Sequence, residues 1–160
     1  MLLSFALATA ASHWSTDLTD LDPTFRARVA RVVGTLEAAG FTPNVGTTWR
    51  SPELQDLLAL GPATQAKGGQ SCHNQEVAGV RASRAIDLWG APLDLALMFG
   101  ATDRMAAEVP FLRALGAAAK KEGLRWGGDW HGHASAWDTW GLGWDPAHIE
   151  VRGCATPRAD

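Results

Sequence analysis

An acidic residue stands inside the otherwise apolar segment Ala85-Ile86-Asp87-Leu88-Trp89, whose composition predicts a buried strand. A carboxylate is costly to bury without a partner, so the fold must bring a compensating group to Asp87. A polar loop that carries Ser71 and His73 leads toward this strand. The sequence therefore requires a fold in which a polar group from elsewhere in the chain meets Asp87.

The length and composition of the chain are those of a globular protein. Its 160 residues fit a single domain, residues 1–160, because one core normally serves about 100–200 residues. Apolar residues make up 46% of the chain and charged residues 19%, which excludes a disordered chain. The net charge of −3 provides no broad basic field, so no nucleic-acid partner is expected.

Residues 1–22 form an N-terminal segment that starts with a small-residue apolar run over 1–12. This run resembles a signal peptide that lacks the usual positively charged start. It is much shorter than the ~20 residues that cross a bilayer as a helix, so no stable membrane anchor is expected. We favour a helix packed on the core, and a cleaved signal is the alternative.

Capping residues and apolar spacing predict the regular elements. Helices are predicted from Pro23 to Gly40, from Pro52 to Gly61, and from about Pro110 to Glu122. Strands are predicted over 41–49, 85–89 and 148–151, and irregular structure over 61–71 and 126–144. Because helices and strands do not alternate regularly, we expect an α+β fold, a small antiparallel sheet with helices packed on one side.

Five histidines are candidates for a metal site: His13, His73, His131, His133 and His148. A hydrolytic zinc site usually takes three ligands from His, Asp or Glu and leaves one position for water. Sequence context favours His73, which precedes the Asp87 strand, and His148, which begins the last strand. Asp145 precedes His148 by three residues, and a tight turn can place both side chains on one side. This spacing predicts a general base beside a metal ligand.

Four motifs occur in the order found in the M15 zinc peptidases, and the resemblance covers roughly residues 23–151. They are Thr48-Trp49-Arg50-Ser51-Pro52-Glu53 with Gln55, Ser71-Cys72-His73, Ala85-Ile86-Asp87-Leu88, and Gly123-Leu124-Arg125-Trp126-Gly127-Gly128-Asp129-Trp130 followed by Asp145-x-x-His148. The chain thus resembles a family of D-alanyl-D-alanine carboxypeptidases, dipeptidases and phage L-alanyl-D-glutamate endolysins.

The resemblance implies one zinc ion per chain, bound by His73, Asp87 and His148 on the sheet of an M15-peptidase or hedgehog-like fold. It also implies that Asp145 activates the attacking water. Arg50 would stabilise the charge that develops on the scissile carbonyl, an effect on the order of 3 kcal/mol for one donor in known hydrolases. The expected chemistry is metal-assisted hydrolysis of an amide bond.

The implied substrate is the stem peptide of bacterial peptidoglycan, and we expect Ser71 and Trp130 to contact it. The small form of the chain resembles phage endolysins, which favours L-alanyl-D-glutamate endopeptidase over D-alanyl-D-alanine carboxypeptidase activity. A non-catalytic zinc-containing module that binds the cell wall or a partner is the alternative from another class. We expect a monomer that acts on the cell wall, either released at phage lysis or exported.

The spacing between the first two ligands departs from the family pattern. His73 and Asp87 stand fourteen positions apart, which is longer than the usual spacing. We expect an inserted loop from Asn74 to Ser83, because the entropy of closing a loop rises only slowly with its length. His131 and His133 are the substitutes if His73 is not a ligand.

The two cysteines, Cys72 and Cys154, each lie close in sequence to an assigned ligand. They could form a disulfide in an oxidising compartment, or they could be two buried free thiols. The residues of the chain do not decide between these alternatives.

Other residues near the motifs have plainer interpretations. Arg50 could pair with Glu53 on the helix that follows it, and Gln55 is interpreted as solvated surface. Of the tryptophans between Trp126 and Trp144, only Trp130 is assigned to the cleft. The others are expected to fill space beneath the Gly-rich segment.

Overall fold

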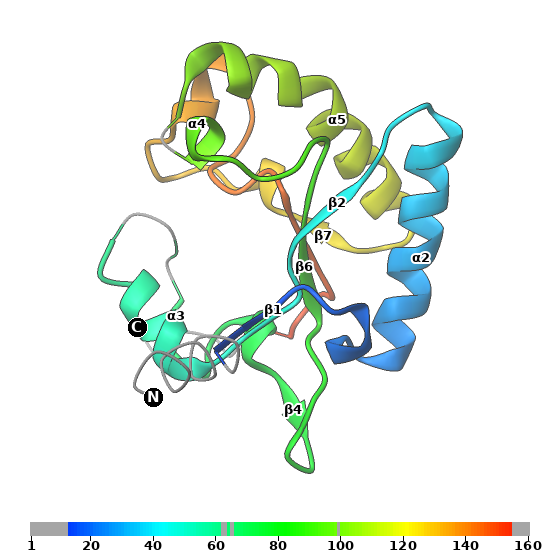
Figure 1. The fold of residues 1–160 in the computed structure, drawn as a ribbon, viewed down its shortest axis with the longest axis vertical. Coiled ribbons are helices and arrows are strands. Elements are labelled where there is room, and N and C mark those ends of the chain that lie inside the picture. Colours follow the sequence, from blue (N-terminus) through cyan, green and yellow to red (C-terminus); the bar gives the residue numbers. More distant parts are fainter. Residues whose placement is uncertain (1–12, 62–63, 65, 99, 155–160) are drawn as a thin grey trace, which may run out of the picture.

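Figure 1 shows the fold of the computed structural model, which describes residues 13–61, 64, 66–98 and 100–154. The apolar run over 1–12, for which we favour a helix, lies outside the described residues. Within the described ranges the α-helices are α2 (Pro23–Ala38), α3 (Pro52–Leu58), α4 (Leu95–Met98) and α5 (Thr102–Lys121), and the 3-10 helices are η1 (Leu18–Asp20), η2 (Cys72–Asn74), η3 (Gly127–Asp129) and η4 (Ala136–Trp140). None of these helices is long and apolar enough to span a bilayer.

The central sheet has four antiparallel strands in the order β2-β6-β8-β7. These strands are β2 (Asn44–Thr47), β6 (Ala85–Trp89), β8 (His148–Glu150) and β7 (Arg125–Trp126). Two small ladders accompany the sheet, one of β1 (Trp14–Ser15) with β3 (Trp49–Arg50) and one of β4 (Glu76–Val77) with β5 (Val80–Arg81).

The two middle strands give the sheet one apolar and one polar face. In their register Ile86 lies opposite Ile149, and Asp87 lies opposite His148. Side chains alternate along a strand, so the two isoleucines point to one face while Asp87 and His148 point to the other. The isoleucines belong to the main core, together with buried side chains of α2 and α5. The structure confirms the α+β class, with the two long helices packed on one side.

Helix α2 starts where its sequence predicts. The Asp22 carboxylate accepts hydrogen bonds from the backbone N–H groups of Thr24 and Phe25, both at 3.0 Å, and Pro23 takes the first helical position. The apolar positions of the helix are buried, namely Phe25, Val29, Val32 and Leu36. Local capping and helical periodicity therefore agree with the core that forms.

Helix α5 is longer than predicted, because it begins at Thr102 and not near Pro110. Proline favours the first turn of a helix, yet Pro110 lies inside α5, where it removes one backbone hydrogen bond. The turns before it bury Met105 and Glu108, and Arg104 pairs with Glu108 at 2.7 Å. The burial of these side chains, the ion pair within the helix and the hydrogen bond that Glu108 accepts from the Gly90 N–H compensate for the proline and extend the helix toward its N-terminus.

The strand predicted over 41–49 divides into β2 and β3. The pairing of β2 with β6 shifts between Val45 and Thr47, which marks a bulge at Gly46. Glycine lets the Trp89 ring lie close to the backbone here, since a Cβ atom on Gly46 would lie 2.8 Å from Nε1 of Trp89 and would push the ring away. Beyond the bulge the chain leaves the central sheet, and β3 pairs with β1.

The segment from Asn74 to Ser83, expected as an inserted loop, contains the hairpin β4–β5. Figure 1 shows that this hairpin projects away from the body of the molecule. The extra residues therefore lead away from the sheet and return to it, and His73 can still approach Asp87 despite the long spacing.

Candidate metal centre

Three potential ligand atoms converge on the polar face of the sheet. His73 Nε2 lies 3.2 Å from His148 Nδ1 and 3.3 Å from Asp87 Oδ1, and His148 Nδ1 lies 3.0 Å from the same oxygen. Both histidines are buried, and Asp87 is mostly buried. The fold thus brings together the three residues that the sequence assigns to a metal.

The spacing and chemistry of these atoms fit one small cation. With bonds of about 2.0–2.1 Å, the ligand atoms of tetrahedral zinc lie about 3.3 Å apart. The separations in this structure are 3.0, 3.2 and 3.3 Å. Two imidazole nitrogens and one carboxylate oxygen also form a donor set that suits zinc. The three side chains could therefore hold a metal ion with little rearrangement.

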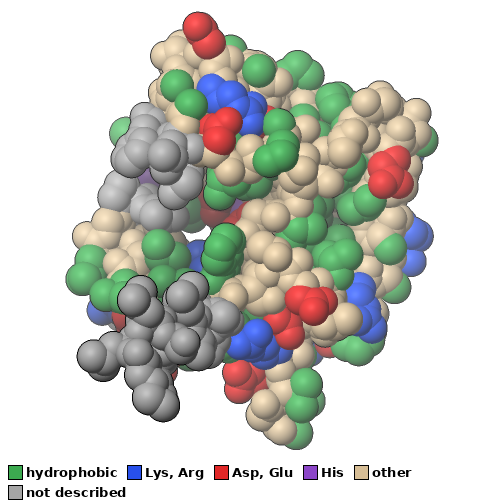
Figure 2. All heavy atoms as spheres, in the orientation of Figure 1, with side chains coloured by type: hydrophobic (Ala, Val, Ile, Leu, Met, Phe, Trp, Pro, Cys, Tyr) green, Lys and Arg blue, Asp and Glu red, His purple; other side chains and the backbone are tan. Residues whose placement is uncertain are grey.

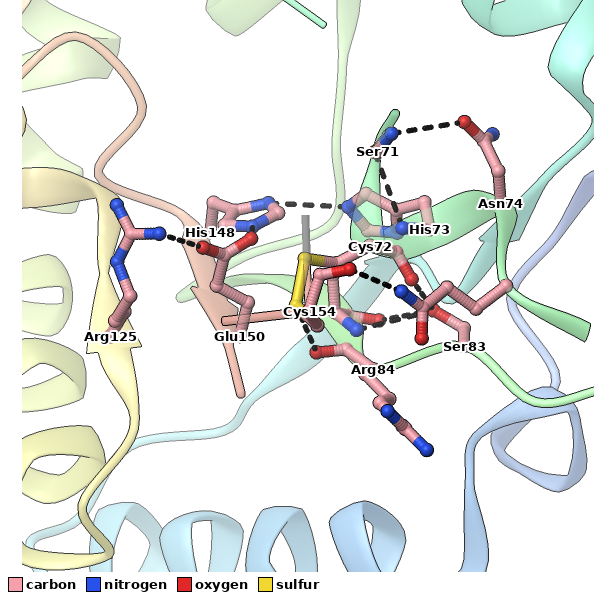
Figure 3. Close-up of a disulfide and its surroundings, with 12 residues drawn as sticks. Ser71, Cys72, His73, Asn74, Ser83, Arg84, Arg125, His148, Glu150 and Cys154 are labelled. Atoms are coloured by element: carbon pink, nitrogen blue, oxygen red, sulfur yellow. Dashed lines mark hydrogen bonds and ion pairs between the residues drawn. A yellow bond between two sulfur atoms is a disulfide. The ribbon is translucent and has the colours of Figure 1, made fainter. Parts of the chain in front are cut away.

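His73 is oriented by contacts on both sides of its ring. It lies in η2, where the hydroxyl of Ser71 accepts a hydrogen bond from the His73 backbone N–H at 3.2 Å (Figure 3). Nδ1 of His73 lies 2.8 Å from the backbone oxygen of Thr48, which can only accept a hydrogen bond. Nδ1 therefore carries the proton, and its N–H donates a hydrogen bond to the Thr48 backbone oxygen. The lone pair of Nε2 faces Asp87 and His148.

Asp145 and Arg50 lie at the edge of the centre. Asp145 Oδ2 is 3.9 Å from His148 Nδ1, and 30% of its side chain is exposed. Arg50 Nη2 donates to Asp87 Oδ2 at 3.2 Å, so Arg50 pairs with the carboxylate of the centre. The alternative pairing of Arg50 with Glu53 does not occur. The structure places a carboxylate near His148 and a guanidinium against Asp87.

Gln55 is fully buried, so its interpretation as solvated surface is wrong. Its Oε1 accepts a hydrogen bond from Arg50 Nη1 at 3.3 Å, and its Nε2 donates to Thr64 Oγ1 at 3.0 Å and to the Ala66 oxygen at 2.9 Å. The apolar pattern of α3 was misleading, because Leu57 is 65% exposed while the polar glutamine faces inward. Gln55 connects Arg50 to the segment after α3.

The two residues predicted to contact substrate differ in their surroundings. The ring of Trp130 lies 5.1 Å from that of His148 and 5.3 Å from that of Trp144. Ser71 is buried and its hydroxyl caps η2. Contact of either residue with substrate stays a prediction.

Figure 2 shows a hollow between α3 and α4, with basic, acidic and histidine atoms visible at its wall.

Other candidates from the Gly- and Trp-rich segment lie outside the centre. His131 and His133 are exposed, and in the described part of the chain neither belongs to a cluster of potential metal ligands. Trp126 and Trp137 are buried in the main core, as expected for rings that fill space. Of His73 and its two possible substitutes, only His73 lies in the cluster with Asp87 and His148.

The charges of the centre perturb one another. Burial, assisted by the charge of Arg50, lowers the pKa of His73 to about 4. Burial also disfavours the charged form of His148, but hydrogen bonds to carboxylates, first that of Asp87, outweigh it and raise the pKa of His148 to about 10. Burial raises the pKa of Asp145 to about 6, although the nearby His148 opposes this change. A metal ion must therefore displace a proton from His148.

Cys72 and Cys154 form a disulfide, with Cα atoms 5.5 Å apart, which decides between the two alternatives for the cysteines. The disulfide packs against Ala85 of β6, on the polar side of the sheet (Figure 3). Because Cys72 directly precedes His73, the bond ties the turn that carries a potential ligand to the end of the described chain.

Sequence reasoning missed three residues that hold the centre in place. The backbone oxygen of Thr48 orients His73, and Glu150 contacts the far side of the His148 ring. Asn74 Nδ2 donates to the Arg50 oxygen at 2.8 Å, which joins η2 to β3. Of these three residues, only Glu150 could have been found from the sequence, because it lies two residues after His148 and therefore on the same face of the predicted strand.

Comparisons with known proteins complete the description of the site. No protein-family model matches the chain, and no curated protein matches it. Among solved structures, the crystal structure of the Serratia marcescens L-Ala D-Glu endopeptidase ChiX matches with a TM-score of 0.48 and 18% sequence identity, over 84% of this chain and 82% of that chain. A likeness of this extent assigns no activity, so the proposed function rests on the side chains of the centre.

Proposed function

We propose that this protein is a zinc peptidase of the M15 type, which hydrolyses an amide bond in the peptidoglycan stem peptide. The observation that carries the proposal is the convergence of His73, Asp87 and His148 at tetrahedral spacing, with Asp145 and Arg50 beside them. A purely structural metal site is normally closed by four protein ligands, whereas a catalytic one has three. Three ligands with an acid and a guanidinium at the edge are therefore better suited to hydrolysis.

A zinc ion in this centre would polarise the scissile carbonyl and make a water easier to deprotonate. Asp145 would accept the proton of the attacking water and return it to the leaving amine. Arg50 would donate hydrogen bonds to the oxygen on which negative charge develops. Asp87 and Gln55 contact Arg50 at 3.2 and 3.3 Å and so fix the direction of its guanidinium.

Within this reaction class we prefer cleavage between L-alanine and D-glutamate, on the resemblance to phage endolysins. The protein would act as a monomer on the bacterial cell wall, after phage lysis or after export. The Cys72–Cys154 disulfide supports a place of action outside a reducing cytosol. A module that only binds the wall would have no use for Asp145 and Arg50 at the edge of the centre.

The test is product analysis on purified sacculi. The zinc-loaded protein is incubated with sacculi, and the soluble fragments are examined by mass spectrometry and amino-acid end-group analysis. We expect newly exposed L-alanine carboxyl groups. Free D-alanine as the main product would instead establish carboxypeptidase activity. Binding to sacculi without any new end group would overturn the enzymatic proposal.

A further inference from the structure

A buried carboxylate, that of Glu150, lies on the far side of His148 from the candidate metal centre and pairs with the partly exposed Arg125. Glu150 Oε2 lies 3.2 Å from His148 Nε2, and Glu150 Oε1 lies 2.8 Å from Arg125 Nη1 (Figure 3). Arg125 and Glu150 are direct partners in the pairing of β7 with β8. Glu150 is only 4% exposed, so its carboxylate depends on these two partners for its polar contacts.

We propose that Glu150, held by Arg125, is a positioning residue that presents Nδ1 of His148 to the metal. This inference rests on the proposed metal centre. A neutral imidazole carries one proton, on either of its two nitrogens. An ionised carboxylate can only accept hydrogen bonds, so the neighbour of Glu150 must be Nε2–H. In the neutral form that binds metal, the lone pair of Nδ1 then points toward Asp87 and His73.

The two histidines of the centre use opposite nitrogens, and each has its own acceptor. His73 donates from Nδ1 to a backbone carbonyl, whereas His148 donates from Nε2 to a carboxylate. A charged acceptor makes the imidazole more basic and so a stronger ligand than a carbonyl does. Glu150 therefore contributes to the strength of metal binding as well as to the orientation of the ring.

Arg125 gives this arrangement a connection to the surface. Its side chain is 40% exposed, and its guanidinium lies 5.0 Å from the centre of the Trp130 ring. That ring in turn lies 5.1 Å from the ring of His148. Arg125 thus contacts both neighbours of His148 on this side, the carboxylate and the indole. Its removal should weaken the positioning of His148 less than loss of Glu150, because Glu150 touches the imidazole directly.

The experiment measures zinc affinity in Glu150→Gln by competition with a chromophoric chelator at constant pH. Glutamine has the size of glutamate but no charge, and we expect zinc to bind 10- to 100-fold more weakly. Glu108→Gln is the matched control, because Glu108 is also buried, pairs with Arg104 at 2.7 Å and accepts from the Gly90 N–H at 2.7 Å. It does not contact the centre, so the affinity should stay within about twofold of wild type.

A second measurement needs no variant of Glu150. Proton–nitrogen NMR correlations of the histidine rings in the zinc-loaded wild type should show His148 with a proton on Nε2. A proton on Nδ1, or unchanged zinc affinity in a folded Glu150→Gln chain, would overturn the positioning role. Failure of the wild type to bind one zinc per chain would overturn the metal centre itself.

Arg125→Gln should lower zinc affinity by a smaller factor than Glu150→Gln.

Discussion

Asp145 and His148 are three residues apart and their side chains are neighbours, but their proposed roles differ: Asp145 is a general base and His148 is a metal ligand. His148 presents a nitrogen to the centre, whereas Asp145 stands 3.9 Å from that nitrogen with part of its side chain open to solvent. A carboxylate at this distance is too far to share the hydrogen bonds that His148 makes with Asp87 and Glu150. Changes at Asp145 should therefore separate catalysis from metal binding.

The variant Asp145→Asn tests whether Asp145 is the general base. The amide keeps the shape of the side chain but cannot take a proton, so release of peptide from sacculi should fall by about 10²- to 10⁴-fold. Zinc content by elemental analysis should stay at one per chain, because none of the three proposed ligands changes. Undiminished release would show that another group is the base, and loss of zinc would show that Asp145 is itself a ligand.

The affinity of the centre for zinc should depend on pH. The raised pKa of His148, about 10, means that this residue must lose a proton to bind metal at pH 8. His73, with a pKa of about 4, is already neutral there and releases none. Binding should release about one proton, and affinity should rise about tenfold per pH unit between 7 and 9. Calorimetry in buffers of different ionisation enthalpy measures this release, and a pH-independent affinity would contradict it.

At the scale of elements, η3 packs directly on the turn that carries Asp145. A Cβ atom on Gly127 would lie 2.0 Å from the backbone oxygen of Asp145, and one on Gly143 would lie 2.6 Å from the backbone oxygen of Gly127. The backbone of η3 therefore lies directly against the backbone of this turn, and the contact leaves no room for a Cβ atom at Gly127 or Gly143. The position of the turn that carries Asp145 therefore depends on this close contact with η3.

Gly127→Ala should consequently disturb both stability and catalysis. The added methyl must push the Asp145 turn away, which we expect to lower the free energy of unfolding by about 1–3 kcal/mol and to reduce activity. Denaturant unfolding and sacculus digestion measure the two effects. Gly34→Ala is the matched control: it lies in α2 with nothing within 4 Å of its added Cβ, and it should stabilise the protein by about 0.5–1 kcal/mol. Equal stability of the two variants would refute the close contact.

At the scale of the whole molecule, the disulfide joins parts of the chain 82 residues apart. It connects η2, which contains His73, with the segment that follows β8, the strand that begins at His148. Closing a long loop restricts the unfolded chain, which favours the folded state.

Reduction should therefore destabilise the metal-free protein. The free energy of unfolding should fall by about 2–4 kcal/mol on reduction or in the double variant Cys72→Ser/Cys154→Ser. Thermal unfolding with a chelator present, with and without reductant, measures this loss, and the double variant should not respond to reductant. We also expect weaker zinc binding by the reduced protein, because His73 loses a tether beside it. An unfolding midpoint unaffected by reductant would contradict the link.

Sequence reasoning worked where structure depends on neighbours along the chain. The Asp22 cap with Pro23 defined the start of α2, and the segment Ala85–Trp89 is a strand with the predicted bounds. It failed where a distant contact overrides a local preference. Pro110 suggested a helix start, yet buried side chains before it extend α5. Gln55 looked like surface, yet it is buried against Arg50.

The order of residues along the chain defines which side chains are available for chemistry and which motifs carry them. An acid in an apolar strand already required a partner, and His73 and His148 were named as ligands from their context. Only the tertiary structure decided that these side chains meet at 3.0–3.3 Å, that Thr48 and Glu150 orient the two rings, and that the cysteines pair. The reason is physical: capping and periodicity act over a few residues, whereas ligand spacing and burial depend on strand register and on packing between distant segments.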